Sequence, residues 1–531
     1  MRKLGWLTSP EYDEALHEKI RIIPPHAAFK APHFTNLILA SLPKEMRGKV
    51  STVRTTLDLD LQTMAEERMR AHLRGLAHKN VTNAAVLILD NRTGDILAMV
   101  GSADFFSAKT DGEVNGALAL RSPGSTLKPF TYGVALEQGM TPASLLPDIE
   151  THIMVSGGDF SPKNYDEHYH GPVRVRTALA NSYNIPAILV QQRVGTAALL
   201  DRLREFGFAS LNREPGYYGA SLTLGDGEVS LLELTRAYRA LANGGVFSRE
   251  KTILSLNGDI SHFVLSKQAA YLVTHILSDN HARIPAFGED SALRFDFPVA
   301  AKTGTSREFR DNWTIGYTTD FTVGVWVGNF DASPMHEVSG VTGAAPIFHD
   351  IMEELESKKS VADFSRPPGI VEREICALSG KRPNRFCHDR MRELFIEGNE
   401  PQELCDFHQA DGVAYPPEYR AWVESEHLTT VSPAIKADKK NGELAIQFPP
   451  DGSVFQIDPV LPREYQMLQF RAVVPPKLLK VTWVLDGRPW STRRPPYSSY
   501  WRLKPGNHKL QLLANANSKS SSPEVRFTVL K

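Results

Sequence analysis

The spacing of apolar residues between positions 81 and 329 predicts five β-strands in two groups. Two apolar runs at the start of this region are separated by Asp90-Asn-Arg-Thr-Gly94, a polar segment typical of a hairpin. Two later runs are separated only by Thr319-Asp320, which predicts a second, tight hairpin. The predicted strands are residues 81–89, 95–100, 297–306, 312–318 and 321–329. Together they predict a five-stranded antiparallel sheet.

Segments with helical spacing precede, separate and follow these strands. In residues 60–76, for example, Leu61, Met64, Met69 and Leu73 recur near helical spacing. The predicted helices are residues 60–76, 125–138, 178–194, 228–243, 268–279 and 344–356, and a strand-like segment is residues 53–57. We therefore predict an α+β fold, in which the five-stranded antiparallel sheet is flanked by helices.

The pattern changes on both sides of this α+β domain, which we place at residues 51–362. Residues 1–50 contain a Pro- and His-containing stretch, and we expect them to be a connector from an upstream domain. Residues 363–438 are rich in Pro, Cys and charge and show little periodicity, which predicts a Cys-containing linker region. In residues 439–531, short alternating runs separated by turns predict a C-terminal all-β sandwich.

The composition is that of an ordinary globular chain with balanced charge. Of its 531 residues, 42% are hydrophobic and 23% are charged, and the formal net charge is −1. This balance gives no electrostatic reason to expect nucleic acid as a partner. The sequence has no run of 18 apolar residues and its N-terminus lacks the apolar core of a signal peptide, so it predicts neither a transmembrane helix nor a signal peptide.

One short motif carries the first candidate chemistry. Ser125 and Lys128 form a Ser-x-x-Lys near the start of a predicted helix, and residues three apart share one helical face. The hydroxyl and the amine can therefore meet, and a lysine whose pKa is lowered can take the proton of the serine. The pattern alone is weak, because it also begins at Ser41 and at Ser248.

Two further motifs follow in the chain and strengthen this prediction. Ser182-Tyr-Asn184 lies near the start of a predicted apolar helix, and Lys302-Thr-Gly-Thr305 lies in a predicted strand. Ser-x-Asn occurs at three other positions, whereas Lys-Thr-Gly occurs once. We expect the central helices to place Ser125 and Ser182 on opposite sides of one cleft.

The order of the three motifs resembles that of penicillin-binding proteins and serine β-lactamases. From about Val50 to the C-terminus, the chain resembles a class A penicillin-binding protein of type 1C; the resemblance includes Thr55–Gln62, Ser182–Ala187, Gly225–Leu234 and the β-rich tail. It implies a protein of the periplasmic face of the inner membrane. It also implies that this chain lacks the family's N-terminal anchor and glycosyltransferase domain, so no glycosyltransferase activity is expected.

The resemblance implies a serine-type peptidoglycan D,D-transpeptidase. Ser125 would attack the carbonyl of a D-alanyl-D-alanine stem peptide, and Lys128 would be its general base. Ser182 would relay a proton to the leaving amine, and Asn184 would bond Lys128 and the substrate. Lys302 would attract the substrate carboxylate. The substrate-binding residues beside it would be Thr303, Gly304 and Thr305, and the backbone N–H groups of Ser125 and Thr305 would form an oxyanion hole.

The implied partners are a D-Ala-D-Ala donor stem peptide, a diamino-acid acceptor stem peptide, β-lactam antibiotics and, through the C-terminal domain, other cell-wall proteins. Three other functions use the same motifs. A D,D-carboxypeptidase would pass the acyl group to water, and a β-lactamase would hydrolyse the drug. No Glu-x-x-x-Asn stretch occurs between Ile185 and Ala300, which counts against a class A β-lactamase. A scaffold or sensor would keep the fold without turnover.

The three cysteines of the chain leave three interpretations open. Cys376, Cys387 and Cys405 lie within one 30-residue window, with His388 and His408 close by. They are compatible with a metal site of three cysteines and one histidine, with one disulfide and one remaining thiol, or with three unpaired thiols. Because no Cys-x-x-Cys knuckle is present, we expect no metal, and the predicted chemistry needs no cofactor.

Overall fold

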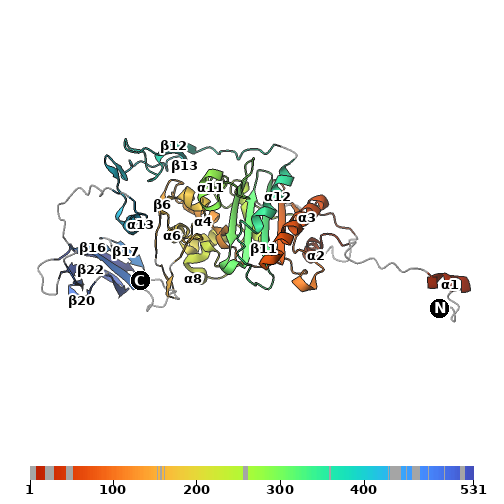
Figure 1. Ribbon diagram of the computed structural model, residues 1–531, viewed down its shortest axis with the longest axis horizontal. Coiled ribbons are helices and arrows are strands. Elements are labelled where there is room, and N and C mark those ends of the chain that lie inside the picture. Colours follow the sequence, from red (N-terminus) through yellow and green to blue (C-terminus); the bar gives the residue numbers. More distant parts are fainter. Residues whose placement is uncertain are drawn as a thin grey trace.

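The computed structural model describes most of the chain, and Figure 1 shows its course. The described residues are 8–17, 29–42, 52–151, 153–155, 158–160, 162–254, 261–357, 360–428, 430, 444–449, 451, 453–456, 467–475, 478–494, 497–514 and 521–530.

The centre of the molecule is a five-stranded sheet with the strand order β2-β1-β11-β10-β9. All neighbouring strands are antiparallel, as in the Lys302↔Ile315 pair of β9 and β10. The sheet therefore has β9, the strand of the Lys-Thr-Gly motif, at one edge. Its strands are β1 (Asn83–Asp90), β2 (Ile96–Val100), β9 (Ala300–Thr305), β10 (Asp311–Tyr317) and β11 (Phe321–Gly328). This confirms the predicted α+β fold with a five-stranded antiparallel sheet.

Helices cover both faces of this sheet (Figure 1). On one face α3 (Leu59–Leu76) and α12 (Ala344–Glu356) pack on the valines of β1 and β11. On the other face α9 (Leu231–Ala242) lies on β10 and β11 and packs on α10 (Lys267–Leu277), which also packs on α4 (Lys128–Glu137). The sheet is therefore buried on both sides, which explains why β10 has no exposed residue.

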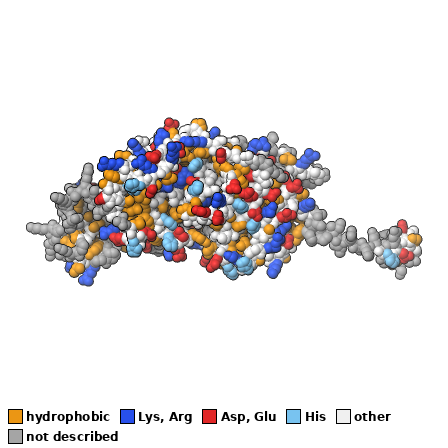
Figure 2. Space-filling view, turned by 45° about the horizontal axis from the view of Figure 1, so that its top comes forward, with side chains coloured by type: hydrophobic (Ala, Val, Ile, Leu, Met, Phe, Trp, Pro, Cys, Tyr) orange, Lys and Arg blue, Asp and Glu red, His pale blue; other side chains and the backbone are white. Residues whose placement is uncertain are grey.

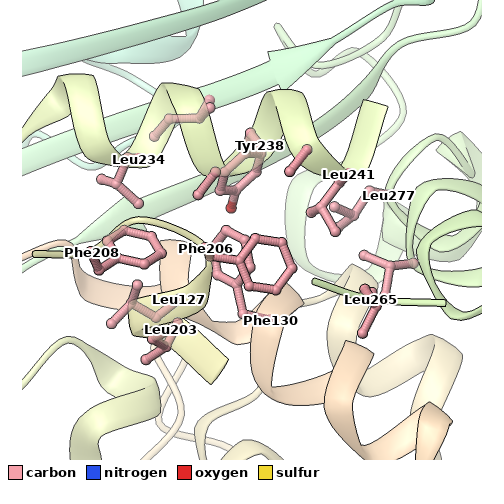
Figure 3. Packing of buried hydrophobic residues seen from close by; sticks show 14 of the residues in the cluster. Leu127, Phe130, Leu203, Phe206, Phe208, Leu234, Tyr238, Leu241, Leu265 and Leu277 are labelled. Atoms are coloured by element: carbon pink, nitrogen blue, oxygen red, sulfur yellow. The ribbon is translucent and has the colours of Figure 1, made fainter. Parts of the chain in front are cut away.

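A large aromatic core lies between α4 and α9 (Figure 3). The ring of Phe130 from α4 makes edge contacts with Phe206, Phe208 and Tyr238, at centroid distances of 4.8, 5.4 and 5.4 Å. All four side chains are fully buried. Rings packed in this way fix the position of α4, and hence of the motif at its start.

The remaining helices and short strands connect or surround these layers. The helices are α1 (Ser9–His17), α2 (Pro32–Ser41), α5 (Val175–Ala180), α6 (Asn184–Val194), α7 (Thr196–Glu205), α8 (Pro215–Tyr218), α11 (Asn280–Phe287) and α13 (Arg420–Ser425). The 3-10 turns are η3 (Ala77–Lys79), η4 (Ala108–Thr110), η5 (Gly124–Leu127), η6 (Gly219–Leu224), η7 (Arg307–Phe309) and η8 (Pro417–Tyr419). The short hairpins pair β3 (Leu145–Asp148) with β6 (Gly171–Arg174), β4 (Ile153–Val155) with β5 (Gly158–Phe160), and β7 (Val246–Phe247) with β8 (His262–Phe263).

A second unit follows the sheet domain and lies against it. It contains the hairpins of β12 (Ile370–Cys376) with β13 (Arg390–Ile396) and of β14 (His408–Gln409) with β15 (Gly412–Val413). The guanidinium of Arg176 in α5 donates two hydrogen bonds to the carboxylate of Glu393 in β13, at 2.8 and 2.6 Å. Both side chains are almost fully buried, so this ion pair ties the hairpin to the sheet domain.

The C-terminal region consists of two sheets that share one core. The first has the order β16-β18-β21 and the second β17-β23-β22-β19-β20. Buried residues of both, including Phe470, Trp483, Trp501 and Phe527, form one cluster. The predicted C-terminal β-sheet structure is thus confirmed. The strands are β16 (Ala445–Phe448), β17 (Ser453–Gln456), β18 (Met467–Val473), β19 (Val481–Leu485), β20 (Arg488–Arg493), β21 (Ser499–Arg502), β22 (Gly506–Leu513) and β23 (Val525–Leu530).

Two local predictions were wrong. Residues 53–57 form no strand, only an isolated bridge from Thr55 to Ile253. The predicted helix 178–194 is two helices, α5 and α6, with a break between them. Within the stretch expected to be a connector, α2 has Phe34 and Ile38 buried in the main core.

The visible surface carries charges of both signs. Lys and Arg side chains lie among Asp and Glu side chains over the face shown in Figure 2. Among the described residues, no helix has both the length and the apolar character needed to cross a membrane.

Candidate active site

The three motifs converge on one cavity of about 1040 Å³. The cavity lies between η5, the break between α5 and α6, and the edge strand β9. Six of the eight predicted site residues line it: Ser125, Ser182, Asn184, Thr303, Gly304 and Thr305. The other two, Lys128 and Lys302, are buried, with 0% and 2% of their surface exposed.

Ser125 lies half-buried in the cavity wall, one turn before α4. The predicted helix 125–138 begins differently from the expectation. Residues 124–127 form the 3-10 turn η5, and α4 starts at Lys128. Leu127 points into the core together with Phe130 (Figure 3), so this turn is anchored from below. The apolar residues of the motif region thereby hold the serine hydroxyl at the cavity.

The turn carrying Ser125 packs directly on β9 because two glycines remove side chains from the contact. A Cβ on Gly304 would lie 2.5 Å from the carbonyl oxygen of Pro123, and a Cβ on Gly124 would lie 2.6 Å from that of Thr305. Gly124 also has φ +54°, a conformation that side chains disfavour. Gly304, which the resemblance implies to be a substrate-binding residue, thus also packs against Pro123.

Ser182 sits in the break between α5 and α6 in a left-handed conformation, with φ +61°. Such a φ is uncommon for a residue other than glycine and costs free energy that the surroundings must supply. It turns the chain so that two carbonyl groups and Asn184 face the same point. This is the physical reason why the predicted continuous helix is interrupted here.

Those groups hold the amine of Lys128. Its Nζ donates to the carbonyl oxygens of Ser182 and Tyr183, at 2.5 and 3.1 Å, and to Oδ1 of Asn184, at 2.7 Å. The Ser182 hydroxyl lies 3.4 Å from the same amine. In the described part of the chain none of the amine's hydrogen bonds goes to Ser125, although the sequence predicted that the two side chains meet. The amine is held instead by the oxygen atoms of Ser182, Tyr183 and Asn184.

Burial and a second cation alter the proton affinity of Lys128. Desolvation lowers the pKa of its amine well below the ordinary value, and the positive charge of Lys302 lowers it further, while the charge of Asp148 opposes both effects. No acidic side chain is among the hydrogen-bond partners that the structure gives this amine. Burial and Lys302 therefore make it easier for this amine to lose its proton, while its hydrogen bonds to three oxygen acceptors favour the charged form.

Lys302 approaches the same serine from the sheet. Its Nζ donates to Oγ of Ser182 at 2.7 Å and to the carbonyl oxygen of its neighbour Thr303 at 2.9 Å. Burial, together with the charge of Arg283, lowers the pKa of Lys302 to about 7. The Ser182 hydroxyl thus lies between two lysine amines, in a position to pass a proton from one side of the cavity to the other.

Asn184 is held by a buried polar network that the sequence analysis missed. Its backbone N–H donates to Oδ1 of Asn164 at 2.8 Å, and the amide of Asn164 donates to both carboxylate oxygens of Asp148, at 2.9 and 2.8 Å. His170 also bonds Asp148, at 2.7 Å, and its ring stacks on Tyr183 with centroids 4.0 Å apart. The network therefore holds both residues that follow Ser182.

The same polar network changes the proton affinity of His170. Burial lowers its pKa, but the hydrogen bond and charge of Asp148 outweigh that effect, so the pKa of His170 is raised. The only sign of this network in the sequence is the Asp- and His-rich stretch at 166–170, which has no periodicity of its own.

Thr305 connects the site to the loop that follows β11. Its hydroxyl accepts a hydrogen bond from the backbone N–H of Gly340 at 3.0 Å. A Cβ on Gly124 would also lie 2.9 Å from the backbone nitrogen of Thr305, so that nitrogen lies beside the turn of Ser125. Within the described residues, the one group with metal-ligand geometry, Cys376, Cys387, Cys405 and His408, lies outside this cavity.

A match over most of the sheet domain identifies the family. A family model described as the penicillin binding protein transpeptidase domain matches residues 84–353, just over half of the chain. The chain belongs to this penicillin-binding protein family. Two further models match parts of the chain after this domain: the penicillin-binding protein 1A C-terminal domain at residues 366–410, and the penicillin-binding protein C-terminus family at residues 434–525.

Individual penicillin-binding proteins match over much of the chain. Penicillin-binding protein 1C of Escherichia coli is 30% identical over 408 residues, which are 75% of this chain and 50% of that protein. Penicillin-binding protein 2D of Bacillus subtilis is 29% identical over 76% of this chain and 61% of its own length. The chain thus spans about half of the length of these relatives.

Solved structures of penicillin-binding proteins share the fold. Penicillin-binding protein 1A from Haemophilus influenzae superposes with a TM-score of 0.64 and 22% identity, covering 76% of this chain and 81% of that one. PonA1 from Mycobacterium tuberculosis in complex with penicillin V gives a TM-score of 0.52 and 22% identity, over 63% of this chain and 94% of that one. The transpeptidase fold is therefore common to all three.

Proposed function

We propose that this chain is a peptidoglycan D,D-transpeptidase that works through an acyl-enzyme on Ser125 and is acylated by β-lactams. The observation that carries the proposal is the convergence of the Lys128 and Lys302 amines on the Ser182 hydroxyl, below a cavity whose wall holds Ser125. A nucleophile, a base of lowered pKa and a cation for a substrate carboxylate are the parts that this reaction needs.

In the first half-reaction, Oγ of Ser125 attacks the carbonyl carbon of the penultimate D-alanine, and its proton passes to Nζ of Lys128. The tetrahedral oxyanion accepts hydrogen bonds from the backbone N–H groups of Ser125 and Thr305. The C–N bond then breaks, and the terminal D-alanine leaves with a proton delivered through the Ser182 hydroxyl. The product is an ester between Ser125 and the donor peptide.

In the second half-reaction, the amine of a neighbouring stem peptide attacks the ester carbonyl. That amine loses a proton to the Lys128 and Ser182 pair, and Oγ of Ser125 leaves and regains its proton. Before the first half-reaction, Lys302, with Thr303 and Thr305, binds the terminal carboxylate of the donor peptide, which later leaves with D-alanine, and a β-lactam uses the same position for its own carboxylate. The periplasmic location belongs to this proposal, because peptidoglycan is cross-linked outside the inner membrane.

The test is mass spectrometry of the intact chain after incubation with benzylpenicillin, for the native sequence, Ser125→Ala and Ser41→Ala. Ser41 begins another Ser-x-x-Lys, but its hydroxyl donates to the carbonyl of Ile38 at the end of α2. We expect a stable covalent adduct on the native chain and on Ser41→Ala, and none on Ser125→Ala.

The other outcomes separate the alternative functions. Rapid hydrolysis of the drug without an adduct would make the chain a β-lactamase, and neither adduct nor hydrolysis would make it a scaffold or sensor. A stem peptide ending in D-Ala-D-Ala, supplied with an amine acceptor, then distinguishes cross-linking from hydrolysis. Release of D-alanine without a cross-linked product would make the chain a carboxypeptidase.

A further inference from the structure

Four potential metal ligands meet outside the active site, in the unit that follows the sheet domain. We call Cys376, Cys387, Cys405 and His408 the cysteine cluster. Cys376 ends β12, Cys387 precedes β13, and Cys405 lies three residues before His408, which begins β14. Their ligand atoms all lie within 4.8 Å of one another. The three cysteines are buried and the histidine is half-buried.

The distances within the cluster fit a shared ion. The sulfurs of Cys376 and Cys405 are 3.6 Å apart, and Nδ1 of His408 is 3.4 Å from each of them. In a tetrahedral zinc site, bonds of about 2.3 Å to sulfur and about 2.0 Å to nitrogen place two sulfurs about 3.8 Å apart and sulfur and nitrogen about 3.5 Å apart. A disulfide would join two sulfurs at about 2.05 Å and would leave Cys387 and His408 without a function.

The backbone around the cluster is arranged to support negatively charged sulfur. The N–H of Ser379 points at Sγ of Cys376, at 3.5 Å, and the N–H of Asn384 points at Sγ of Cys387, at 3.3 Å. Each donor lies three residues from its cysteine, so a tight turn aims the N–H at the sulfur. A thiolate, which is the form that binds a metal, gains more from such donors than a thiol does.

Asn384 ties the two halves of the cluster together. Its side-chain amide donates to the carbonyl oxygens of Cys405 and His408, both at 2.8 Å. One residue beside Cys387 thus fixes the chain at both ends of the Cys405–His408 turn. Outer hydrogen bonds that orient ligands in this way are a regular part of protein metal sites.

The unit around the cluster has too few apolar residues to hold it together alone. The apolar cluster around the four ligands consists of the three cysteines and Phe407, with partly buried side chains such as Leu378, Val413 and Tyr415. The buried Ile375 and Phe395 of β12 and β13 pack on Ala143 of the sheet domain instead. A small unit with so little apolar surface needs a disulfide, a metal or a neighbouring domain for its stability. A metal that binds only the folded state would stabilise this fold directly.

The geometry points to one zinc ion bound tetrahedrally by Cys376, Cys387, Cys405 and His408, and we propose this as a structural site of the protein. It replaces the expectation that the chain binds no metal. Four protein ligands leave no open position for substrate, so the ion has a structural function. Leu145 of β3 packs against the cluster, and a Cβ on Gly380 would lie 2.0 Å from the carbonyl oxygen of Ala143. The ion therefore fixes the surface that contacts β3, the strand that carries Asp148.

The test is the metal content of the full chain, purified under reducing conditions without chelator and measured by inductively coupled plasma mass spectrometry. We expect about one zinc ion per chain. Cys405→Ser and His408→Ala should weaken zinc binding by more than about 100-fold, because loss of an outer hydrogen bond alone costs 10- to 100-fold. His388→Ala is the matched control: this exposed histidine is next to Cys387 but outside the cluster, and its loss should leave the zinc content unchanged.

A measurement on the native chain covers the case in which the variants fail to fold. After chelation of the zinc, which has no visible absorption of its own, added Co²⁺ should produce the visible bands and the thiolate-to-metal charge-transfer band of a tetrahedral cobalt–thiolate site. Zinc-free chain with a Cys376–Cys405 disulfide, iron in place of zinc, or zinc that is unaffected by Cys405→Ser would each overturn the proposal. Absence of the charge-transfer band on adding Co²⁺ would do so as well.

Discussion

The active site and the cysteine cluster both gather buried polar groups, but they stand in opposite relations to the rest of the fold. Lys128 and Lys302 are buried in the sheet domain, where desolvation makes their charge unfavourable. Around the cysteine cluster the apolar residues are few, and those of β12 and β13 pack on the sheet domain. In the first region the fold supports the polar groups, and in the second the polar groups support the fold.

This difference decides what a substitution should change in each region. Replacing a polar group of the active site should reduce chemistry and leave stability the same or higher, since buried lysines and a left-handed serine cost free energy. Replacing a buried polar group around the hairpin of β12 and β13 should reduce stability and leave chemistry intact. The predictions below test this division.

The largest expected effect is on chemistry, from Lys128→Met. Loss of a general base lowers a rate by about 10²- to 10⁴-fold, so we expect acylation by benzylpenicillin to slow by that factor. The melting temperature should change little, because removal of a desolvated amine offsets the loss of its hydrogen bonds to Ser182, Tyr183 and Asn184. Stopped-flow acylation and thermal unfolding measure the two effects. Lys251→Met, in the Ser-x-x-Lys that begins at Ser248, is the control and should acylate normally; a large loss of stability in Lys128→Met would contradict the division.

The converse effect is expected from Glu393→Gln at the border between the two regions. It leaves the buried guanidinium of Arg176 without its main partner, which costs about 3–5 kcal/mol of local stability. Hydrogen exchange should show earlier opening of β12 and β13, with an unchanged acylation rate. The exposed pair Arg392–Glu372 in the same hairpin is the control, since Glu372→Gln should cost about 0–1 kcal/mol. Equal losses of stability in Glu393→Gln and Glu372→Gln would contradict the distinction between the buried and the exposed ion pair.

The pH dependence should separate activity from stability at Lys302. Since its pKa is lowered to about 7, Lys302 loses its charge above that pH, and acylation by a carboxylate-bearing drug should fall about tenfold per pH unit there. The unfolded chain keeps the proton up to the ordinary lysine pKa, so this group makes the fold more stable as pH rises through the same range. Acylation rates measured at steps of about one pH unit between about pH 6 and about pH 9 test this prediction. Lys302→Arg should move the decline in rate to higher pH.

The smallest expected effect comes from the backbone of Ser182. Ser182→Gly should stabilise the fold by about 1 kcal/mol relative to Ser182→Ala, because glycine tolerates the φ of +61° and alanine does not. Both variants remove the hydroxyl and should acylate equally slowly. Thermal unfolding compares the two; equal melting temperatures would show that the left-handed conformation carries no strain.

Much of the sheet domain could be predicted from local pattern. The helix at Ala344–Glu356 has the predicted bounds, and the strand at Phe321–Gly328 differs by one residue, because long apolar segments with clear ends leave little ambiguity. The motif residues could be named for a different reason. Their order along the chain resembles that of a known family, and no periodicity would have brought Ser125, Ser182 and Lys302 together.

The features that could not be predicted depend on contacts distant in sequence or on unusual backbone. The left-handed Ser182 interrupts a segment whose composition is helical throughout. Asp148, Asn164 and His170 are linked only in three dimensions. The strand β12 was missed because its central residues are exposed charges, so the apolar alternation is absent. In the cysteine cluster, nothing in the spacing distinguishes His408 from His388.

The close approach of Gly304 to Pro123 and of Gly124 to Thr305 limits which residues these two positions can hold. A side chain at either glycine would strike the backbone of the facing segment. The rim offers more freedom. Tyr165, which is 71% exposed, meets Phe309 edge-on at 6.3 Å across the mouth of the cavity. Substitutions at Tyr165 and Phe309 should therefore reshape the mouth of the cavity at little cost to the fold, whereas a side chain at Gly124 or Gly304 should destabilise it.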